Sequence, residues 1–243
     1  MTRALKDYKA LTFDCYGTLI DWEGGIWDAL QPLVQTSGRN DVDRDTALLA
    51  FAEIESAQQA ATPGMIYPQV LEHVHHAFAQ RFDLATGVDL DRAFGNSVQH
   101  WPAFADTADA LRILKKHYKL VILSNVNRDG FAASNRKLGV EFDAIYTAQD
   151  VGSYKPNPAN FDYMLGHIAT DLGIEAGDIL HTAQSMFHDH VPAKAAGLDC
   201  AWIDRQNLAE GGSWGATAVV ENRPGVDFRF RSMMEMARTV AVA

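Results

Sequence analysis

The sequence predicts an α/β fold with a Rossmann-like parallel-sheet core, helices on both faces of the sheet, and an inserted all-helical cap domain. Two observations lead to this fold class. Short apolar runs of strand length alternate with amphipathic helical segments over most of the chain, which is typical of a parallel sheet with crossover helices. Between about residues 21 and 99 this alternation stops, and helical periodicity continues without a convincing strand.

The expected strands are short apolar runs of the fully buried type. In chain order they are Ala10–Phe13, Leu120–Leu123, Ala144–Thr147, Ile179–Ala183 and Ala201–Ile203. The third run is the weakest. Helices are expected between them near Asp106–His117, Asp129–Leu138, Pro158–Leu172 and Val191–Ala196. The last helix stops before Gly197, a usual helix-ending residue.

The inserted region is expected to form four helices. The clearest lies near Ile66–Arg81, where apolar residues recur at every fourth position, and we interpret this stripe as core packing. The chain therefore divides into a Rossmann-like catalytic core at 1–20 and 100–243 and a helical cap at 21–99, over the active end of the sheet. The Gly-rich segment 209–228 is expected to be a surface loop before a last short helix.

Charge and composition argue against several classes of partner. The formal net charge is −10, from 31 acidic and 21 basic residues, and no basic patch is visible, which disfavours nucleic acid and membrane surfaces. The cysteines, Cys15 and Cys200, make no disulfide framework and are expected to be reduced. Neither a signal-peptide region nor a run of membrane-spanning length is visible, so a cytoplasmic protein is expected.

The candidate catalytic residues all follow predicted strands. Asp14 ends the first strand before a Gly-containing turn, which can aim its carboxylate as a nucleophile. Ser124 and Asn125 end the second strand, where a hydroxyl and an amide can bind an oxyanion. Lys155 lies in a Pro-flanked loop as a cation that can hold Asp14 ionised, and Asp189 follows the fourth strand. The carboxyl ends of parallel strands form the site in such folds.

Taken in order, these segments resemble the four motifs of the haloacid dehalogenase-like hydrolase superfamily, over essentially the whole chain. They read DCYGT, LVILSN, GSYKPNPANF and ILHTAQSMFHDHVPAKAAG. The phosphatase branches of that superfamily have a second aspartate two residues after the nucleophile, whereas this chain has Tyr16. A halide leaving group needs no proton. DCYGT is similar to the signature of the 2-haloacid dehalogenase (type II) branch, and the helical insertion matches that branch's cap.

The resemblance implies an (S)-2-haloacid dehalogenase that converts short 2-haloalkanoic acids to 2-hydroxy acids and halide without a cofactor. Asp14 would attack the halogen-bearing carbon and form an ester, which water activated by Asp189, with Lys155 nearby, would hydrolyse. Thr18 would fix the loop that presents Asp14.

The same resemblance places the substrate carboxylate against Ser124 and the backbone N–H groups around Cys15 and Tyr16. Asn125 and His188 are candidate halide contacts, His188 could instead shuttle a proton to the hydrolytic water, and Trp22 is a candidate for the pocket wall. For His188 the alternative, a hydrogen-bonded histidine that stabilises its loop, stays open. The Cys15 thiol itself is expected to face the packing, because neighbours along a strand point to opposite sides.

Three features depart from the branch. Phe51 stands near the position of the cap arginine that receives the halide, with Arg39 and Arg44 upstream as substitutes only if their loop folds inward. A pocket tyrosine of the branch appears as Phe161. The fourth motif retains a single carboxylate, Asp189, so a metal-free site is favoured over magnesium.

Two other functions remain open from the sequence. One is a phosphatase of the same superfamily that acts on a small phosphate ester, and the other is a non-catalytic member that binds a small acid or a protein partner. The expected partner is a small-molecule haloacid, with no nucleic acid and no membrane. Exposed faces of the cap allow a homodimer.

Overall fold

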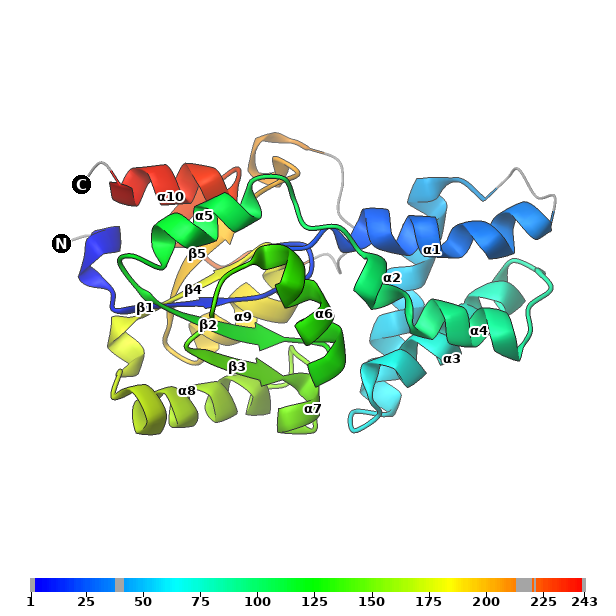
Figure 1. Cartoon of the computed structure of the whole chain (residues 1–243), viewed down its shortest axis with the longest axis horizontal. Coiled ribbons are helices and arrows are strands. Elements are labelled where there is room, and N and C mark those ends of the chain that lie inside the picture. The colour runs from blue at the N-terminus through cyan, green and yellow to red at the C-terminus, as the bar shows by residue number, and fades with distance from the viewer. Residues whose placement is uncertain (1–2, 38–41, 213–219, 221, 242–243) are drawn as a thin grey trace.

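The computed structural model describes residues 3–37, 42–212, 220 and 222–241. Within these ranges, six parallel strands form one sheet in the order β3-β2-β1-β4-β5-β6 (Figure 1). The strands are β1 (Ala10–Phe13), β2 (Lys119–Ser124), β3 (Ala144–Thr147), β4 (Ile179–Ala183), β5 (Asp199–Ile203) and β6 (Phe228–Phe230). The first five include every predicted strand, and the predicted α/β class is confirmed. β6 falls at the end of a segment that was predicted to be a loop.

The strand order reverses at β1. From β1 the chain builds outward through β2 and β3, then returns to place β4 on the other side of β1. Open α/β sheets bind ligands in the crevice at such a reversal, beyond the carboxyl ends of the strands. The residue that follows β1 is Asp14, so the topology puts this carboxylate at the crevice.

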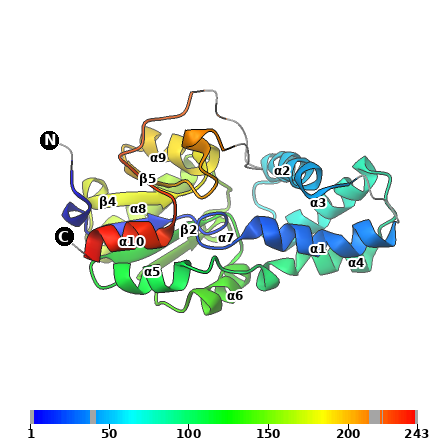
Figure 2. The same ribbon diagram turned by 90° about the horizontal axis from the view of Figure 1, so that it is seen from above.

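Helices cover both faces of the sheet (Figure 2). Helices α5 (Thr107–Leu114), α6 (Arg128–Leu138) and α10 (Met233–Ala241) cover one face, and α8 (Ala159–Leu172) and α9 (Val191–Ala195) cover the other. The short α7 (Ala148–Val151) follows β3 directly. Alternate residues of β2 enter the two cores: Ile122 packs with the α5 side and Val121 with the α8 side. This two-sided burial explains why the strands are apolar throughout.

Between β1 and α5 the described residues form four α-helices, which lie beyond the carboxyl ends of the strands (Figure 1). They are α1 (Trp22–Thr36), α2 (Arg44–Ala61), α3 (Tyr67–Arg81) and α4 (Val88–Gly95). We call this group the cap; the domain limits at residues 20 and 99 stay a prediction. Asp21 and Asp43 cap α1 and α2 by accepting the N–H groups of Gly24 and Thr46, a preferred way to begin a helix.

The cap is packed closely on the segment that returns to the core. A Cβ on Gly25 of α1 would lie 2.3 Å from the ring of Trp101, so only glycine allows this approach. The stripe predicted over Ile66–Arg81 is buried at Val70, Val74 and Phe78, whereas Ile66 precedes α3 and is exposed. The buried residues of the cap therefore join the same apolar cluster as the α5 side of the sheet.

Short turns complete the described chain. Single 3₁₀ turns occupy Leu5–Asp7, Ser97–His100, Ala176–Asp178 and Leu208–Glu210. Of the Gly-rich segment 209–228 that was predicted to be a loop, residues 213–219 and 221 lie outside the described residues. None of the helices in the described part of the chain could cross a membrane, because all of them are too short or too polar.

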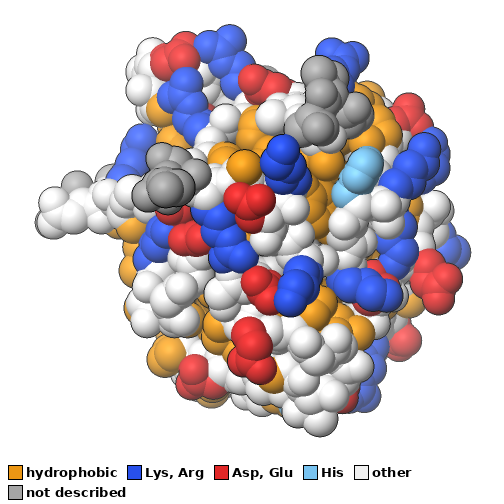
Figure 3. Space-filling model, turned by 90° about the vertical axis from the view of Figure 1, so that its left-hand side faces the viewer, with side chains coloured by type: hydrophobic (Ala, Val, Ile, Leu, Met, Phe, Trp, Pro, Cys, Tyr) orange, Lys and Arg blue, Asp and Glu red, His pale blue; other side chains and the backbone are white. Residues whose placement is uncertain are grey.

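The face opposite the cap carries basic and acidic side chains side by side (Figure 3). At the amino ends of the strands these side chains form ion pairs: Asp178 pairs with Arg3 and Lys9, and Asp143 pairs with Lys115 and Lys119. Mixed charges of this kind favour solubility and give no single-sign field for a polyanion.

Candidate active site

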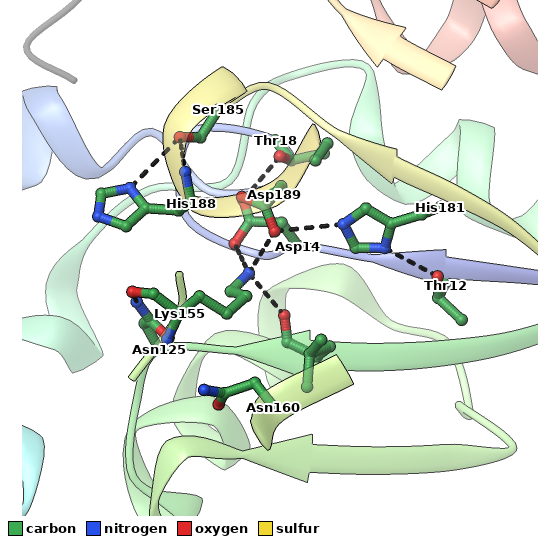
Figure 4. Close-up of polar contacts among 12 residues, drawn as sticks. Thr12, Asp14, Thr18, Asn125, Lys155, Asn160, His181, Ser185, His188 and Asp189 are labelled. Carbon is green, nitrogen blue, oxygen red and sulfur yellow. Dashed lines mark hydrogen bonds and ion pairs between the residues drawn. The ribbon is translucent and has the colours of Figure 1, made fainter. Parts of the chain in front are cut away.

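The Asp14 carboxylate is held on both oxygens. Thr18 Oγ1 donates to Oδ2 at 2.7 Å, and Lys155 Nζ donates to Oδ1 at 2.9 Å (Figure 4). Thr18 Oγ1 also accepts the N–H of Gln184, at 2.9 Å. Between the two residues the backbone turns at Gly17, whose φ of +95° is disfavoured for other residues. Thr18 thus both contacts the carboxylate and ties its loop to the end of β4.

Lys155 connects the two acids of the site. Its side chain is 1% exposed, and Nζ donates to Asp14 Oδ1, to Asp189 Oδ1 at 2.6 Å and to the Leu123 carbonyl at 2.9 Å. These bonds use all three donors of an ammonium group. The Asn125 amide fixes the backbone of Lys155 by donating to its carbonyl at 3.0 Å and accepting its N–H at 2.7 Å. Asn125 therefore positions the lysine.

Asp189 lies in a five-residue π-helical turn, Met186–His190, directly after β4. Ser185 caps this turn by accepting the N–H of His188. Besides Lys155, Asp189 Oδ1 contacts His181 Nε2 at 3.2 Å, and His181 Nδ1 lies 2.9 Å from Thr12 Oγ1. If the ring carries its proton on Nε2, His181 donates to Asp189 and can accept from the Thr12 hydroxyl at Nδ1.

His181 was not predicted as a site residue, although it touches the catalytic candidate Asp189. Histidine 181 is fully buried in the middle of β4 and is paired in register with Thr12 of β1. A histidine inside an apolar strand run, beside a threonine at the same level of the neighbouring strand, was the available signal. The sequence alone does not show that β1 pairs with β4, so it could not show that His181 lies beside Thr12.

Burial and the shared ammonium set the ionisation of the three groups. For Asp14, burial raises the pKa above its usual value, and the Lys155 charge only partly opposes this. For Asp189, burial also acts to raise the pKa, but Lys155 and the hydrogen bond from His181 outweigh it and hold the pKa below its usual range. For Lys155, burial acts to lower the pKa, but the two carboxylates outweigh burial and raise it. Lys155 is therefore charged, and Asp14 is the carboxyl that protonates first.

Ser124 and Cys15 are both buried beside the nucleophile. Ser124 ends β2, and its Oγ has no hydrogen-bond partner within the described residues, although Ser124 is not among the residues that line the pocket above Asp14. The Cys15 thiol is fully buried in the apolar core, and this burial raises its pKa. Any contact of Cys15 with a substrate would thus be made by its backbone.

A pocket of about 70 Å³ opens onto Asp14 and Asp189 between the sheet and the cap. Its core wall consists of Asp14, Asn125, Lys155, Ser185, His188 and Asp189. Tyr16, Trp22 and Trp101 line the junction of core and cap. Its cap wall consists of Ala52, Glu55, Ser56 and Gln59 from α2 and Tyr67 from α3. Four predicted substrate-binding residues therefore line it: Tyr16, Trp22, Asn125 and His188.

A family model described as haloacid dehalogenase-like hydrolase matches residues 8–181. The chain belongs to this family. The chain is also similar in sequence to individual proteins that are named as dehalogenases. It is 23% identical over 210 residues to an (S)-2-haloacid dehalogenase of Pseudomonas putida, covering 84% of this chain and 88% of that protein. It is 27% identical over 214 residues to the haloacetate dehalogenase H-2 of a Moraxella species, covering 84% and 89%.

Solved structures of the family have the same fold. One is the L-2-haloacid dehalogenase of Xanthobacter autotrophicus with chloropropionic acid covalently bound, which superposes with a TM-score of 0.77 at 17% identity. The match covers 96% of this chain and 98% of that chain. The sheet and the cap of this chain are thus arranged as in the Xanthobacter autotrophicus structure.

His188 and His190 flank Asp189 but differ in surroundings. Burial lowers the pKa of His188 to about 4, so its ring is neutral near pH 7, with Nδ1 at 3.3 Å from Ser185 Oγ. A neutral ring offers no positive charge to a halide. His190 is fully buried, and Nε2 donates to the Ala183 carbonyl at 2.9 Å. This hydrogen bond gives His190 a role in holding the turn.

Two residues at which this chain departs from the resemblance, Phe51 and Phe161, are not among the residues that line the pocket. Phe51 is buried against Trp22 and Phe94, with ring centroids 5.9 Å and 6.1 Å away. Phe161 is buried edge-on to His181, at 5.1 Å between centroids. Arg44 is not in the pocket lining, and Arg39 lies outside the described residues. Among the described lining residues, Lys155 is the one basic side chain.

The carboxylates of this family member do not fit a magnesium site. Magnesium prefers an octahedron of oxygen ligands. Here Asp14 and Asp189 each have one oxygen hydrogen-bonded to Lys155, and Asp14 Oδ2 accepts from Thr18. In the described part of the chain, no three His, Cys, Asp or Glu side chains are grouped so as to hold a metal ion.

Proposed function

We propose that this chain is a hydrolytic dehalogenase that converts short 2-haloalkanoic acids to 2-hydroxy acids and halide through an ester on Asp14. The observation that carries the proposal is the arrangement of Asp14, Lys155 and Asp189 at the floor of a small pocket that has Tyr16 in place of a second acid. The names of the relatives support the same reaction.

In the first step an Asp14 oxygen attacks the halogen-bearing carbon. The new carbon–oxygen bond forms as the carbon–halogen bond breaks, and the halide leaves with the bonding electron pair. No proton is transferred, so the step needs no general acid. Lys155 and Thr18 hold the carboxylate in place for in-line attack, which reduces the entropic part of the barrier.

In the second step water attacks the acyl carbon of the Asp14 ester. One water proton passes to Asp189, and the tetrahedral intermediate then expels the substrate oxygen, which takes that proton and leaves as the 2-hydroxy acid. The other water proton stays on the Asp14 carboxyl and is lost to solvent. Among the described residues, Asp189 Oδ2 is buried without a hydrogen-bond partner, so its lone pairs are free for the water.

The substrate carboxylate would lie near the free Ser124 hydroxyl and the backbone N–H groups around Cys15 and Tyr16. A pocket of about 70 Å³ suits acids of two or three carbons. Location in the cytoplasm, a homodimer, and the absence of nucleic acid and membrane partners remain predictions from the sequence.

The test is a single-turnover reaction with 2-chloropropionate in oxygen-18 water. The expected result is unlabelled lactate from the first turnover and label in the Asp14 peptide. Label in the first lactate would contradict the ester route. Asp14→Asn should abolish chloride release, whereas Asp89→Asn, at an exposed site on α4, should not change it. Magnesium-dependent hydrolysis of an aryl phosphate, without halide release, would instead identify a phosphatase.

A further inference from the structure

One face of α2 forms the cap wall of the pocket. Ala52, Glu55, Ser56 and Gln59 line the pocket, and their spacing of three, four and seven residues places them on one side of a helix. This face lies where the halogenated carbon of a substrate would meet the cap. Neither Glu55 nor Gln59 belonged to the predicted site, so the role of an acid here needs an explanation.

Glu55 is fixed by one oxygen and open at the other. The buried Tyr67 hydroxyl of α3 donates to Glu55 Oε1 at 2.6 Å. Tyr67 is itself held edge-on to Trp101, with ring centroids 6.4 Å apart. Within the described residues, Glu55 Oε2 has no hydrogen-bond partner. The carboxyl therefore keeps one orientation and has one oxygen available to a ligand.

The direction of the proposed attack makes Glu55 a neighbour of the leaving group. Displacement in line sends the halide away from the side on which Asp14 attacks. Asp14 is on the core wall, and the cap lies beyond the carboxyl ends of the strands (Figure 1). The halide thus departs toward α2. Lys155 cannot stabilise it, because its three donors are engaged by Asp14, Asp189 and Leu123.

We propose that Glu55, in its protonated form and oriented by Tyr67, donates a hydrogen bond to the departing halide. This inference rests on the proposed dehalogenase function and assigns Glu55 as a catalytic residue that discriminates between leaving groups. Fluoride accepts the strongest hydrogen bonds of the halides and is the poorest leaving group. Cleavage of a carbon–fluorine bond therefore depends most on this donor.

The electrostatics of the pocket agree with a protonated Glu55. Burial raises its pKa to about 7, although the Tyr67 hydrogen bond acts in the opposite direction. Ionised Glu55 would repel the departing anion. The rate should therefore fall as the pH rises through this pKa.

The other titratable groups around Glu55 either have pKa values in other pH ranges or can be told apart from Glu55 by the substitution Glu55→Gln. From α3 and the loop after α7, Tyr67 and Tyr154 have pKa values raised by burial, that of Tyr67 well above 10. His188 has a pKa near 4. On the core side, Asp14, Asp189, Lys155 and Tyr16 share the pocket. Glu23 of α1, whose pKa burial raises to about 8, lies outside the pocket lining.

The experiment measures kcat for halide release from fluoroacetate, chloroacetate and bromoacetate between about pH 6 and pH 9. For fluoroacetate and the unmodified chain we expect kcat to fall about tenfold per pH unit above the pKa of Glu55. Glu55→Gln keeps an N–H donor and cannot ionise, so the fall should disappear. Glu55→Ala should lower kcat about 10- to 100-fold for fluoroacetate and less than about threefold for bromoacetate.

A matched control is Glu53→Gln, on the exposed side of the same helix, which should leave the three rates and their pH dependence unchanged. An equal loss for all three substrates in Glu55→Ala would overturn the proposal, because a merely structural role does not depend on the leaving group. The proposal would also be overturned if kcat of Glu55→Gln still decreased as the pH rises.

If no halide is released from any substrate, the proposed function fails, and the halide site is then tested by binding. Bromide and fluoride are titrated against the fluorescence of the pocket tryptophans, Trp22 and Trp101. Binding that weakens as pH rises through 7 and that Glu55→Ala abolishes supports a halide donor at Glu55. Absence of binding, or binding that is the same in Glu55→Ala, overturns it.

Discussion

The Lys155 ammonium lies 2.6 Å from the Asp189 carboxylate, and each of these side chains is only 1% exposed. An ion pair so deeply buried is costly to break, because the remaining charge has no solvent. The same ammonium holds Asp14 at 2.9 Å. Two carboxylates in one pocket can therefore stay ionised only while Lys155 lies between them.

Lys155→Met should remove both stability and activity. Two buried carboxylates would face each other without a counter-charge, so we expect a loss of about 3–5 kcal/mol in the free energy of unfolding. Halide release should fall about 10²–10³-fold, since the nucleophile loses its orienting cation. Urea unfolding and chloride release from 2-chloropropionate measure the two effects. Lys116→Met, at an exposed lysine on the core, is the control. Activity within tenfold of the unmodified chain would contradict the role of Lys155.

The rate should also have an acid limb that reports Asp14. Only ionised Asp14 is a nucleophile, and burial raises its pKa above 3.8. Halide release should therefore decline as the pH falls, at a higher pH than for an ordinary aspartate. Glu55→Gln should leave this limb in place while it removes the alkaline limb. A profile of kcat/KM that stays flat down to about pH 4 would refute the assignment.

The stability of the fold should respond to acid through Asp189. Its folded pKa lies below the unfolded value, so its contribution is present above the unfolded pKa and is lost as the pH falls through the folded pKa. Asp14 acts in the opposite sense, because its raised pKa favours the fold below the unfolded pKa and that contribution is lost as pH rises. Asp189→Asn should therefore flatten the decrease of unfolding free energy in acid. Denaturant titrations at several pH values measure this change, and an unaltered slope would contradict it.

Local sequence was sufficient for the parts of the site that follow strands. Asp14 comes directly after an apolar run, Ser124 ends one, and Asp189 lies in the turn that follows another. Parallel strands bring their carboxyl ends together whatever the packing in between. β6 escaped prediction because its three residues, Phe228–Phe230, pair with β5 alone at the edge of the sheet. A segment so short carries no periodicity that distinguishes it from a loop.

Residues whose roles depend on the meeting of two elements could not be predicted. Glu55 reads in the sequence as one polar residue on a mixed helix, and it becomes a pocket residue only when α2 packs over the sheet. His181 contacts Asp189 only because the π-helical turn Met186–His190 brings the Asp189 side chain back toward the end of β4. No spacing rule in the sequence encodes either approach.

His181 should be needed for the second chemical step more than for the first. It touches Asp189 but not Asp14, so His181→Gln should slow ester hydrolysis about 10- to 100-fold while ester formation continues. The enzyme would then accumulate the Asp14 ester, which intact-protein mass spectrometry of a quenched reaction detects. Thr12→Val should give a smaller effect in the same direction, and His117→Gln, at an exposed site, should give none. An equal loss in both steps would place His181 in folding rather than in the positioning of Asp189.

The substitution Tyr16→Phe removes a single hydroxyl and thereby tests whether position 16 donates a proton to the leaving group, as a phosphatase would require. The Tyr16 hydroxyl is 3.0 Å from Ser134 Oγ, and the ring lies edge-on to Trp101 at 5.3 Å, so the residue is fixed by packing and by a hydrogen bond to the core. Burial raises the pKa of Tyr16 well above 10, which makes it a poor acid. Removal of the hydroxyl should cost about 1 kcal/mol of unfolding free energy and leave kcat for chloroacetate within about threefold, because a halide needs no proton. A loss of a hundredfold or more, without unfolding, would show that this position donates a proton after all.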